Sequence, residues 1–225
     1  LDPAQRLGCA IWDVVVHADR GRDEMIDLLS DEPAEYEDRT IEGLDLAGEE
    51  VRAKEFAGCT FVGCSFLETA FVECRFVDCE FARCDLSLCR VEDCSFTTVK
   101  FLDSQVIGVN WTEASWPAFG LSHAIGFARC ALDHSTFIGL GLKRVEIVDC
   151  QAREADFAEA DLSLADCTGT DFEGSRFLHT DLTEADFRGA KNYAIAPNLN
   201  VLRKTKFALP EAMALLYGLD IILTE

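Results

Sequence analysis

Residues 74–98 read CRFVD CEFAR CDLSL CRVED CSFTT, which is five successive copies of one five-residue pattern. Each copy begins with cysteine and carries a large apolar residue at its third position. A period of five is neither the 3.6 of a helix nor the 2 of a strand. The stretch therefore predicts a repeat architecture, because a unit this small cannot bury its own apolar residue and needs neighbours to cover it.

The same pattern extends through most of the chain. A large apolar residue returns at every fifth position from Ile41 to Leu121; the phase then slips by one residue, and the pattern resumes from Phe127 to Phe187. We call these the large positions. The residues two before them, the small positions, are mostly Cys, Ala, Ser or Thr. Each unit thus offers two side chains to an interior and three polar ones to solvent.

Cysteine usage bears on the redox compartment. Nine of the eleven cysteines occupy small positions, where they interchange with Ala, Ser and Thr, and the sequence has no CxxC pair. This favours reduced cysteines packed in the core over disulfides or a zinc site, and reduced thiols indicate the cytoplasm. The apolar stretch 7–18 contains Asp13 and is too short and wrongly flanked for a signal peptide or membrane span, so we expect no membrane association.

The net charge is −21, divided as −8 in residues 1–38, −14 in 39–190 and +1 in 191–225. One interpretation is solubility. The other is an extended negative field, which cannot hold DNA or an anionic membrane by charge but can occupy a basic groove that normally holds DNA. The outward acids that we expect to face such a partner are Glu73, Asp78, Asp93, Asp103, Glu154, Glu159, Glu173 and Glu184.

Catalytic patterns are not evident in the sequence. The four histidines are scattered without metal or triad spacing, and no glycine loop of the phosphate-binding kind is present. A solenoid filled with phenylalanine leaves no interior pocket for paired carboxylates. We therefore expect a binding protein and not an enzyme, with no cofactor and no metal.

The units CRFVD, ADFAE and TDFEG follow the signature A(D/N)Lxx, and from about Ile41 to Ala190 the chain resembles the pentapeptide-repeat family. The resemblance implies an all-β solenoid, a right-handed quadrilateral β-helix in which four units make one square coil. Each face would then repeat every twenty residues, so that cysteines such as Cys64 and Cys84 stack at about the 4.8 Å strand spacing.

The segment after Ala190 leaves the repeat pattern. Pro210 suits the first turn of a helix, Gly218 suits its end, and residues 219–223 suggest a short strand. One interpretation is a cap over the last coil. However, the tail Leu209-Pro-Glu-Ala with Leu219-Asp-Ile resembles the gyrase-protecting branch of the family, the Qnr-type quinolone-resistance and AlbG-like albicidin-resistance proteins, as does the segment 108–117. In that branch the tail is a two-fold dimer interface, which here implies Phe207, Leu209, Pro210, Met213, Leu215, Leu216, Tyr217, Ile221 and Ile222.

The branch also implies a function. Its members mimic duplex DNA in size and charge, bind the DNA-gate saddle of the gyrase A subunit or the topoisomerase IV equivalent, and protect the enzyme from a poison. Such a homodimer would bind no nucleic acid directly. The alternative is an acidic scaffold or structural repeat protein with no topoisomerase partner.

Two segments depart from the repeats. Trp111 and Trp116 take large positions and Pro117 follows, ahead of the phase slip near 122–126, which suggests either local repacking or a kink that shapes the rod to its partner. Residues 1–38 predict helices at 3–18 and 23–30, as a cap or a partner-binding arm. We therefore expect three parts: this N-terminal part, the repeats at 39–190 and a C-terminal segment at 191–225.

Overall fold

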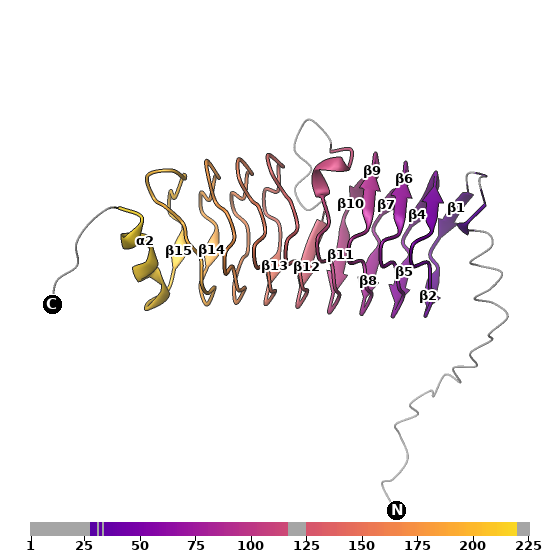
Figure 1. Cartoon of the computed structure of the whole chain (residues 1–225), viewed down its shortest axis with the longest axis horizontal. Helices are drawn as coiled ribbons and strands as arrows, with labels where there is room; N and C mark the ends of the chain where they lie inside the picture. Colours follow the sequence, from indigo (N-terminus) through magenta and orange to yellow (C-terminus); the bar gives the residue numbers. More distant parts are fainter. Residues whose placement is uncertain (1–27, 31, 33, 117–124, 220–225) are drawn as a thin grey trace, which may run out of the picture.

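The computed structural model describes residues 28–30, 32, 34–116 and 125–219. These residues form a parallel β-solenoid of about 8 turns with a short C-terminal helix (Figure 1). The predicted all-β repeat fold is confirmed. The coil has four faces, which we number I to IV in chain order.

Faces I and II carry the regular strands. Face I is built from β1 (Ala34–Glu37), β4 (Lys54–Ala57), β7 (Arg75–Val77) and β10 (Ser95–Thr97). Face II is built from β2 (Thr40–Glu42), β5 (Thr60–Val62), β8 (Glu80–Ala82), β11 (Val99–Leu102), β12 (Ile125–Ala128) and β13 (Ile147–Val148). Bridges from Glu146 through Asp166 continue face II to β14 (Asp186–Phe187), which pairs with β15 (Lys206–Phe207).

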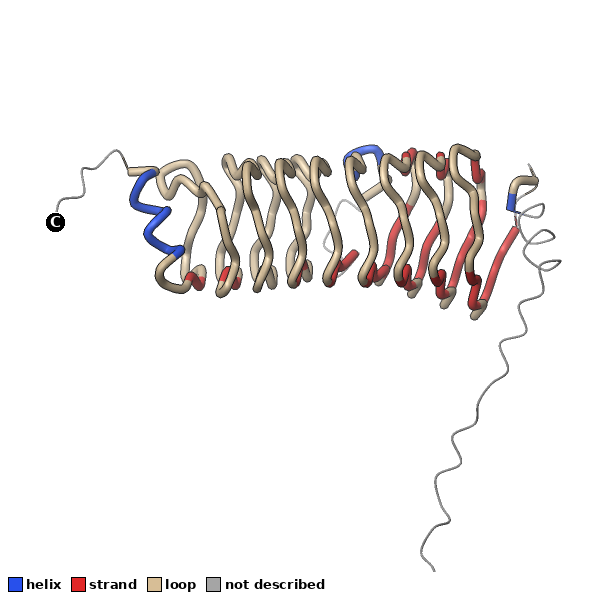
Figure 2. Tube along the Cα trace, turned by 60° about the horizontal axis from the view of Figure 1, so that its bottom comes forward, coloured by secondary structure: helices blue, strands red, loops and turns tan. Residues whose placement is uncertain are grey.

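Faces III and IV are less regular. Face III is held by isolated bridges that step from Asp45 to Lys191. Face IV contains β3 (Glu50–Arg52), β6 (Ala70–Val72) and β9 (Arg90–Glu92), followed by the 3-10 turn η1 (Trp111–Glu113). All strand pairs are parallel and link each residue to its equivalent one coil later, as the tube in Figure 2 shows.

The large positions form ladders through the interior. On face I, the ring centroids of Tyr36, Phe56, Phe76 and Phe96 are separated by 5.1, 5.1 and 5.3 Å in nearly parallel stacks. Rings on adjacent faces meet edge to face, as do Phe76 and Phe81 at 5.7 Å. These buried rings form one continuous core, and burial of apolar area is the main stabilising contribution to such a fold.

The residues at the small positions also form hydrogen bonds between coils. Their hydroxyls and thiols donate to the carbonyl of the large residue 23 positions earlier: Thr69 Oγ1 to Leu46 at 2.6 Å, and Cys64 Sγ to Ile41 at 3.5 Å. Cys, Ser and Thr interchange there because each is a small donor. All ten cysteines in the described part of the chain are buried with free thiols.

The predicted one-residue phase slip is a larger insertion in the structure. Glu80 pairs with Lys100 twenty residues later, but Val99 pairs with Ile125, and the offset across this point is 26. One whole unit and one extra residue therefore leave the coil between faces I and II, where residues 117–124 lie outside the described part. Because units resemble one another, the sequence periodicity hides the extra unit.

The ends also differ from the expected boundaries. Strand pairing already begins at β1, before residue 39, and continues to β15, beyond residue 190. The expected helix at 3–18 and most of that at 23–30 lie outside the described residues. At the C-terminus, η2 (Glu211–Met213) and α2 (Ala214–Tyr217) follow Pro210. Within the described ranges, no helix is long and apolar enough to cross a membrane.

Candidate functional site

Two groups of acidic side chains are distinguished by their place in the repeat unit. The first class immediately precedes a large position, and its carboxylate accepts the backbone N–H two residues later. Its members are Asp45, Asp85, Asp156, Asp161, Asp166, Asp171, Asp181 and Asp186. These bonds satisfy a turn of the chain itself, so this class is structural.

The second class lies at the corners of the coil, two residues after a large position. Seven of the eight acids predicted to face a partner are corner residues with φ between 50° and 60°, and Glu173 is the exception. All eight side chains are exposed. The corners require a left-handed backbone, which is strained for residues other than glycine.

The II–III corner is electrically balanced. Its consecutive residues Arg83, Asp103, Arg129 and Asp149 alternate in sign along the rod. Arg129 donates to both carboxylate oxygens of Asp103 at 2.6 and 2.8 Å, and this contact lowers the pKa of Asp103. This corner therefore offers little net negative charge to a basic partner.

The IV–I corner has the opposite character. Glu73, Asp93 and Glu113 follow one another in three successive coils, and Glu159 lies farther along the same corner beyond Gly139. No ion pair with a described residue involves any of the four. We call Glu73, Asp93 and Glu113 the acidic ridge. Its members repel one another at about the 4.8 Å coil spacing, without a basic residue among them.

The structure thus divides the predicted acids instead of grouping them. Glu73, Asp93 and Glu159 share the IV–I corner, and Asp78 is exposed on the I–II corner. The others have basic neighbours: Glu154 and His134 Nδ1 at 3.2 Å, Glu173 and Arg153 at 3.7 Å, and Glu184 and Lys204 at 3.4 Å. Glu113 was not predicted. Its signal is the twenty-residue step from Asp93, which matters only once the faces are known.

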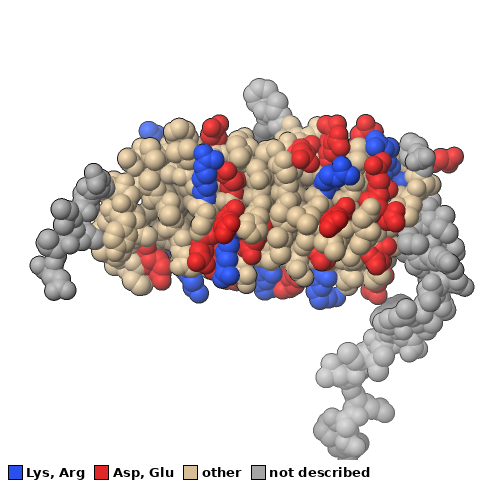
Figure 3. Space-filling model, viewed as in Figure 1, with Lys and Arg blue, Asp and Glu red and all other residues tan. Residues whose placement is uncertain are grey.

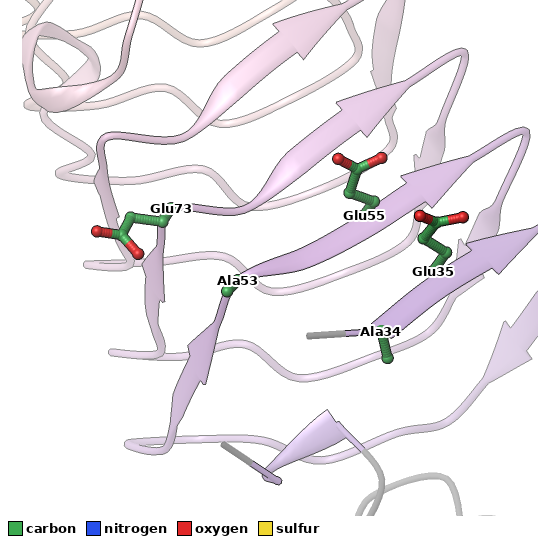
Figure 4. A pocket seen from close by; sticks show the side chains of 5 residues that line it. All are labelled: Ala34, Glu35, Ala53, Glu55 and Glu73. Atoms are coloured by element: carbon green, nitrogen blue, oxygen red, sulfur yellow. The ribbon is translucent and has the colours of Figure 1, made fainter. Parts of the chain in front are cut away.

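The ridge begins beside an open hollow at the N-terminal end. Ala34, Glu35, Ala53, Glu55 and Glu73 line it, and Glu35 and Glu55 are neighbours on the paired strands β1 and β4 (Figure 4). Residues 34–53 contain seven acids and two bases. Acidic side chains gather around β4, β6 and β9 on the side of the rod seen in Figure 3. The negative potential is therefore strongest toward the N-terminus.

The C-terminal end has the opposite composition. Residues 200–219 contain three bases and one acid, and no residue of η2 or α2 is fully buried. Leu209 and Tyr217 are 76% and 77% exposed. Leu215 packs against the core of its own chain. Gly218 ends the helix without a left-handed backbone; a Cβ there would approach Ala196 Cα to 2.9 Å, so close packing requires the glycine.

Among the other predicted tail residues, Phe207, Pro210, Met213 and Leu216 are described, and Ile221 and Ile222 lie outside the described part.

Trp111 and Trp116 are ladder residues. Trp116 stacks on Phe96 at 6.1 Å and donates its Nε1 to the Trp111 carbonyl at 2.7 Å, while Trp111 is fully buried. Face II runs without interruption past this point, and Pro117 is outside the described residues.

Among the described residues, no three His, Cys, Asp or Glu side chains are grouped to hold a metal ion. Burial raises the pKa of the Cys79 thiol to about 11 and that of Cys89 to about 12, which keeps these thiols protonated. What the surface offers is contact area and charge.

The fold and its surface define an acidic parallel β-solenoid whose units are five residues long. Family profiles for a pentapeptide repeat region and for pentapeptide repeats (8 copies) match residues 54–123 and 149–191. The chain belongs to the pentapeptide-repeat family. A search among curated proteins found no relative of this sequence.

Solved structures share the fold at low sequence identity. Full-length QnrB1, a plasmid-mediated fluoroquinolone resistance protein, is 18% identical with a TM-score of 0.51, over 84% of this chain and 98% of QnrB1. A trypsin-treated QnrB1 variant is 19% identical with a TM-score of 0.53, and the match covers 85% of this chain and 98% of the variant. A third structure is HetL of the cyanobacterium Nostoc sp. strain PCC 7120, a pentapeptide-repeat protein involved in heterocyst differentiation regulation. It is 13% identical with a TM-score of 0.57, and the match covers 82% of this chain and 92% of HetL. At such identities the likeness concerns the fold alone.

Proposed function

We propose that this protein is a DNA mimic that binds the DNA-gate saddle of the gyrase A subunit and protects gyrase from a topoisomerase poison. It acts by binding and not by catalysis, as a cytoplasmic homodimer, and topoisomerase IV is a second target. The observation that carries the proposal is the acidic ridge. The resemblance of the tail to the gyrase-protecting branch supports the choice of partner.

The ridge opposes the stability of the isolated protein because stacked like charges repel. Asn110 Nδ2 donates to Glu113 at 2.9 Å and Arg52 interacts electrostatically with Glu73, so this repulsion is compensated only in part within the chain. Left-handed corners without glycine occur throughout the coil, so the run of like charges, and not the backbone, distinguishes the ridge. A basic partner would neutralise the repulsion.

The spacing of the ridge suits a site made for DNA. A DNA strand carries one phosphate per about 3.4 Å of helix axis. One carboxylate per coil gives a charge about every 4.8 Å, and Glu55 and Glu92 on the flanking faces add to it. The charge density along the three coils of the ridge is thus comparable to that of one DNA strand.

Dimerisation would extend the rod. The exposed Leu209 and Tyr217 at the C-terminal end support a second copy as the occupant, because burying a large apolar side chain contributes about 1.5–3 kcal/mol. Tail-to-tail contact would place the two acidic N-terminal halves at opposite ends. This arrangement resembles a duplex segment with charge on both arms.

The test is a gyrase supercoiling assay with a poison, in which quinolone and albicidin-type compounds are compared. The wild type should restore supercoiling. The ridge variant E73K/D93K/E113K should lose protection and bind the A subunit at least about tenfold more weakly, since each lost contact charge removes part of the electrostatic attraction. The matched control D38K/E68K/D149K has the same charge change on three other corners and should retain most of the activity.

Each outcome discriminates between mechanisms. An equal loss of protection in both variants would show that total charge, and not the ridge, determines binding. Full protection by both variants would refute charge mimicry. Inhibition of gyrase without rescue of supercoiling would support DNA mimicry and refute protection from the poison. Absence of any gyrase effect in the wild type would favour the acidic scaffold with no topoisomerase partner.

The tail assignment is tested separately by L209E/Y217E, which alters the two most exposed apolar residues and leaves Leu215 in its intramolecular contact. Light scattering should give a dimer for the wild type and a monomer for this variant. A dimer that persists in the variant would exclude this end as the interface.

A further inference from the structure

Lys54 breaks the pattern of the small positions. The equivalent residues on face I are Ala34, Cys74, Cys94 and Ala114, all small. Lys54 nevertheless points inward, and its exposed fraction is 0%. A buried ammonium group is costly unless it is paired or fully hydrogen-bonded, so its contacts indicate why a lysine stands there.

The ammonium group binds the segment that precedes the first coil. Lys54 Nζ donates to the Ser30 carbonyl at 3.0 Å, to Ser30 Oγ at 3.1 Å and to the Glu32 carbonyl. All three ammonium donors are therefore used. We call residues 28–30 and 32 the N-terminal plug. Leu28 of the plug is 2% exposed and belongs to the continuous core, and Leu29 packs against it.

The plug lies where the solenoid would otherwise be open. β1, β2 and β3 are each the terminal strand of their sheet in the described part of the chain. Their outer backbone groups can pair with another chain, a hazard that solenoids meet with capping segments. The described residues of the plug lie at this end, beyond β1 (Figure 2).

We propose that Lys54 locks the N-terminal plug over the first coil, and that the locked plug prevents the open strand edges from pairing with a second copy of this chain. Lys54 is a positioning residue in this device. It replaces a small residue because only a long donor reaches from the second coil, past the paired Ala34 of the first, to the carbonyls of the plug. The plug covers an interaction surface made of strand edges. Such an edge can bind the strand edge of a second copy through backbone hydrogen bonds.

The test uses the full chain with K54A, because alanine occupies the same position at Ala34 and Ala114 and should fold there. The control K100A removes an exposed lysine without an ion pair in the described part. Hydrogen exchange measured by mass spectrometry should speed up by at least about tenfold in the plug of K54A, since several charge-assisted hydrogen bonds are lost. It should not change in K100A.

A second readout is the mass of the assembly across a concentration series. K54A should form species heavier than those of the wild type at equal concentration, with new exchange protection in residues 34–52. Unchanged exchange in the plug would refute the lock. A plug that opens without heavier species would refute the protection of the edge. If K54A does not fold, S30A, which removes one of the three acceptors, should give the same two changes to a smaller degree, and their absence would overturn the proposal.

Discussion

Stacking within a ladder is open to a matched comparison between Phe76 and Phe66. Both are 1% exposed and both occupy large positions. Phe76 stacks between two rings, Phe56 at 5.1 Å and Phe96 at 5.3 Å. Phe66 lies in a face III ladder with Leu46 and Leu86 one coil away on either side, so it meets other rings only across the faces.

Replacing either residue with leucine keeps most of the buried apolar area. At Phe76 the change also removes two stacked pairs, and each aromatic pair is worth about 0.5–1.5 kcal/mol beyond its area. Phe76 also loses two cross-face pairs and Phe66 loses three, so Phe76 loses four aromatic pairs in all against three. F76L should therefore lower the free energy of unfolding by about 0.5–1.5 kcal/mol more than F66L.

The measurement is urea unfolding followed by circular dichroism, with the slope of the transition checked for two-state behaviour, because repeat arrays can lose cooperativity. A difference between the variants below about 0.5 kcal/mol, the usual limit of additivity, would refute the reasoning. The ladders would then act through burial alone, and the parallel ring geometry would be a consequence of the coil spacing without energetic weight.

Three further measurements probe corners, charge and thiols. G63A should cost about 1 kcal/mol in a thermal scan for its left-handed backbone, and G169A should cost about the same, because only the exposed carboxylate of Asp149 has to rotate away from the new Cβ; a cost several times larger for G169A would contradict this. Hydrogen bonds from a neighbouring arginine lower the pKa of Asp186 to about 2, so its contribution is present above about pH 4 and is lost as the pH falls toward 2. D186N should flatten the pH dependence of stability in that window, and an unchanged profile would refute the assignment. An aromatic disulfide reagent at pH 8 should leave Cys89 and the other described thiols unmodified in the folded protein and reach all eleven cysteines in denaturant; rapid native labelling of Cys89 would show that the core opens.

The period of five is a local property, and by itself it predicted stacked units with the large and small positions inward and the polar positions outward, from Ile41 to Phe187. That four units close one coil, and hence that the ladders step by twenty, followed from the resemblance to the family. The helical segment between Pro210 and Gly218 was also predicted, although Gly218 serves close packing and not a left-handed cap. Lys54 could have been noticed as a charge at an inward position, although its target could not.

Tertiary structure alone decided which acids share a corner. Units that look alike can leave the coil without disturbing the period, and the 26-residue step from Val99 to Ile125 changes the face of every later residue. The balanced II–III corner, where Arg129 pairs with Asp103, and the position of Glu159 on the IV–I corner depend on that register. The acidic ridge depends on the twenty-residue coil, and the partners of Lys54 lie outside the repeats. They join residues twenty or more positions apart, and a repeating sequence does not record which of its copies come into contact.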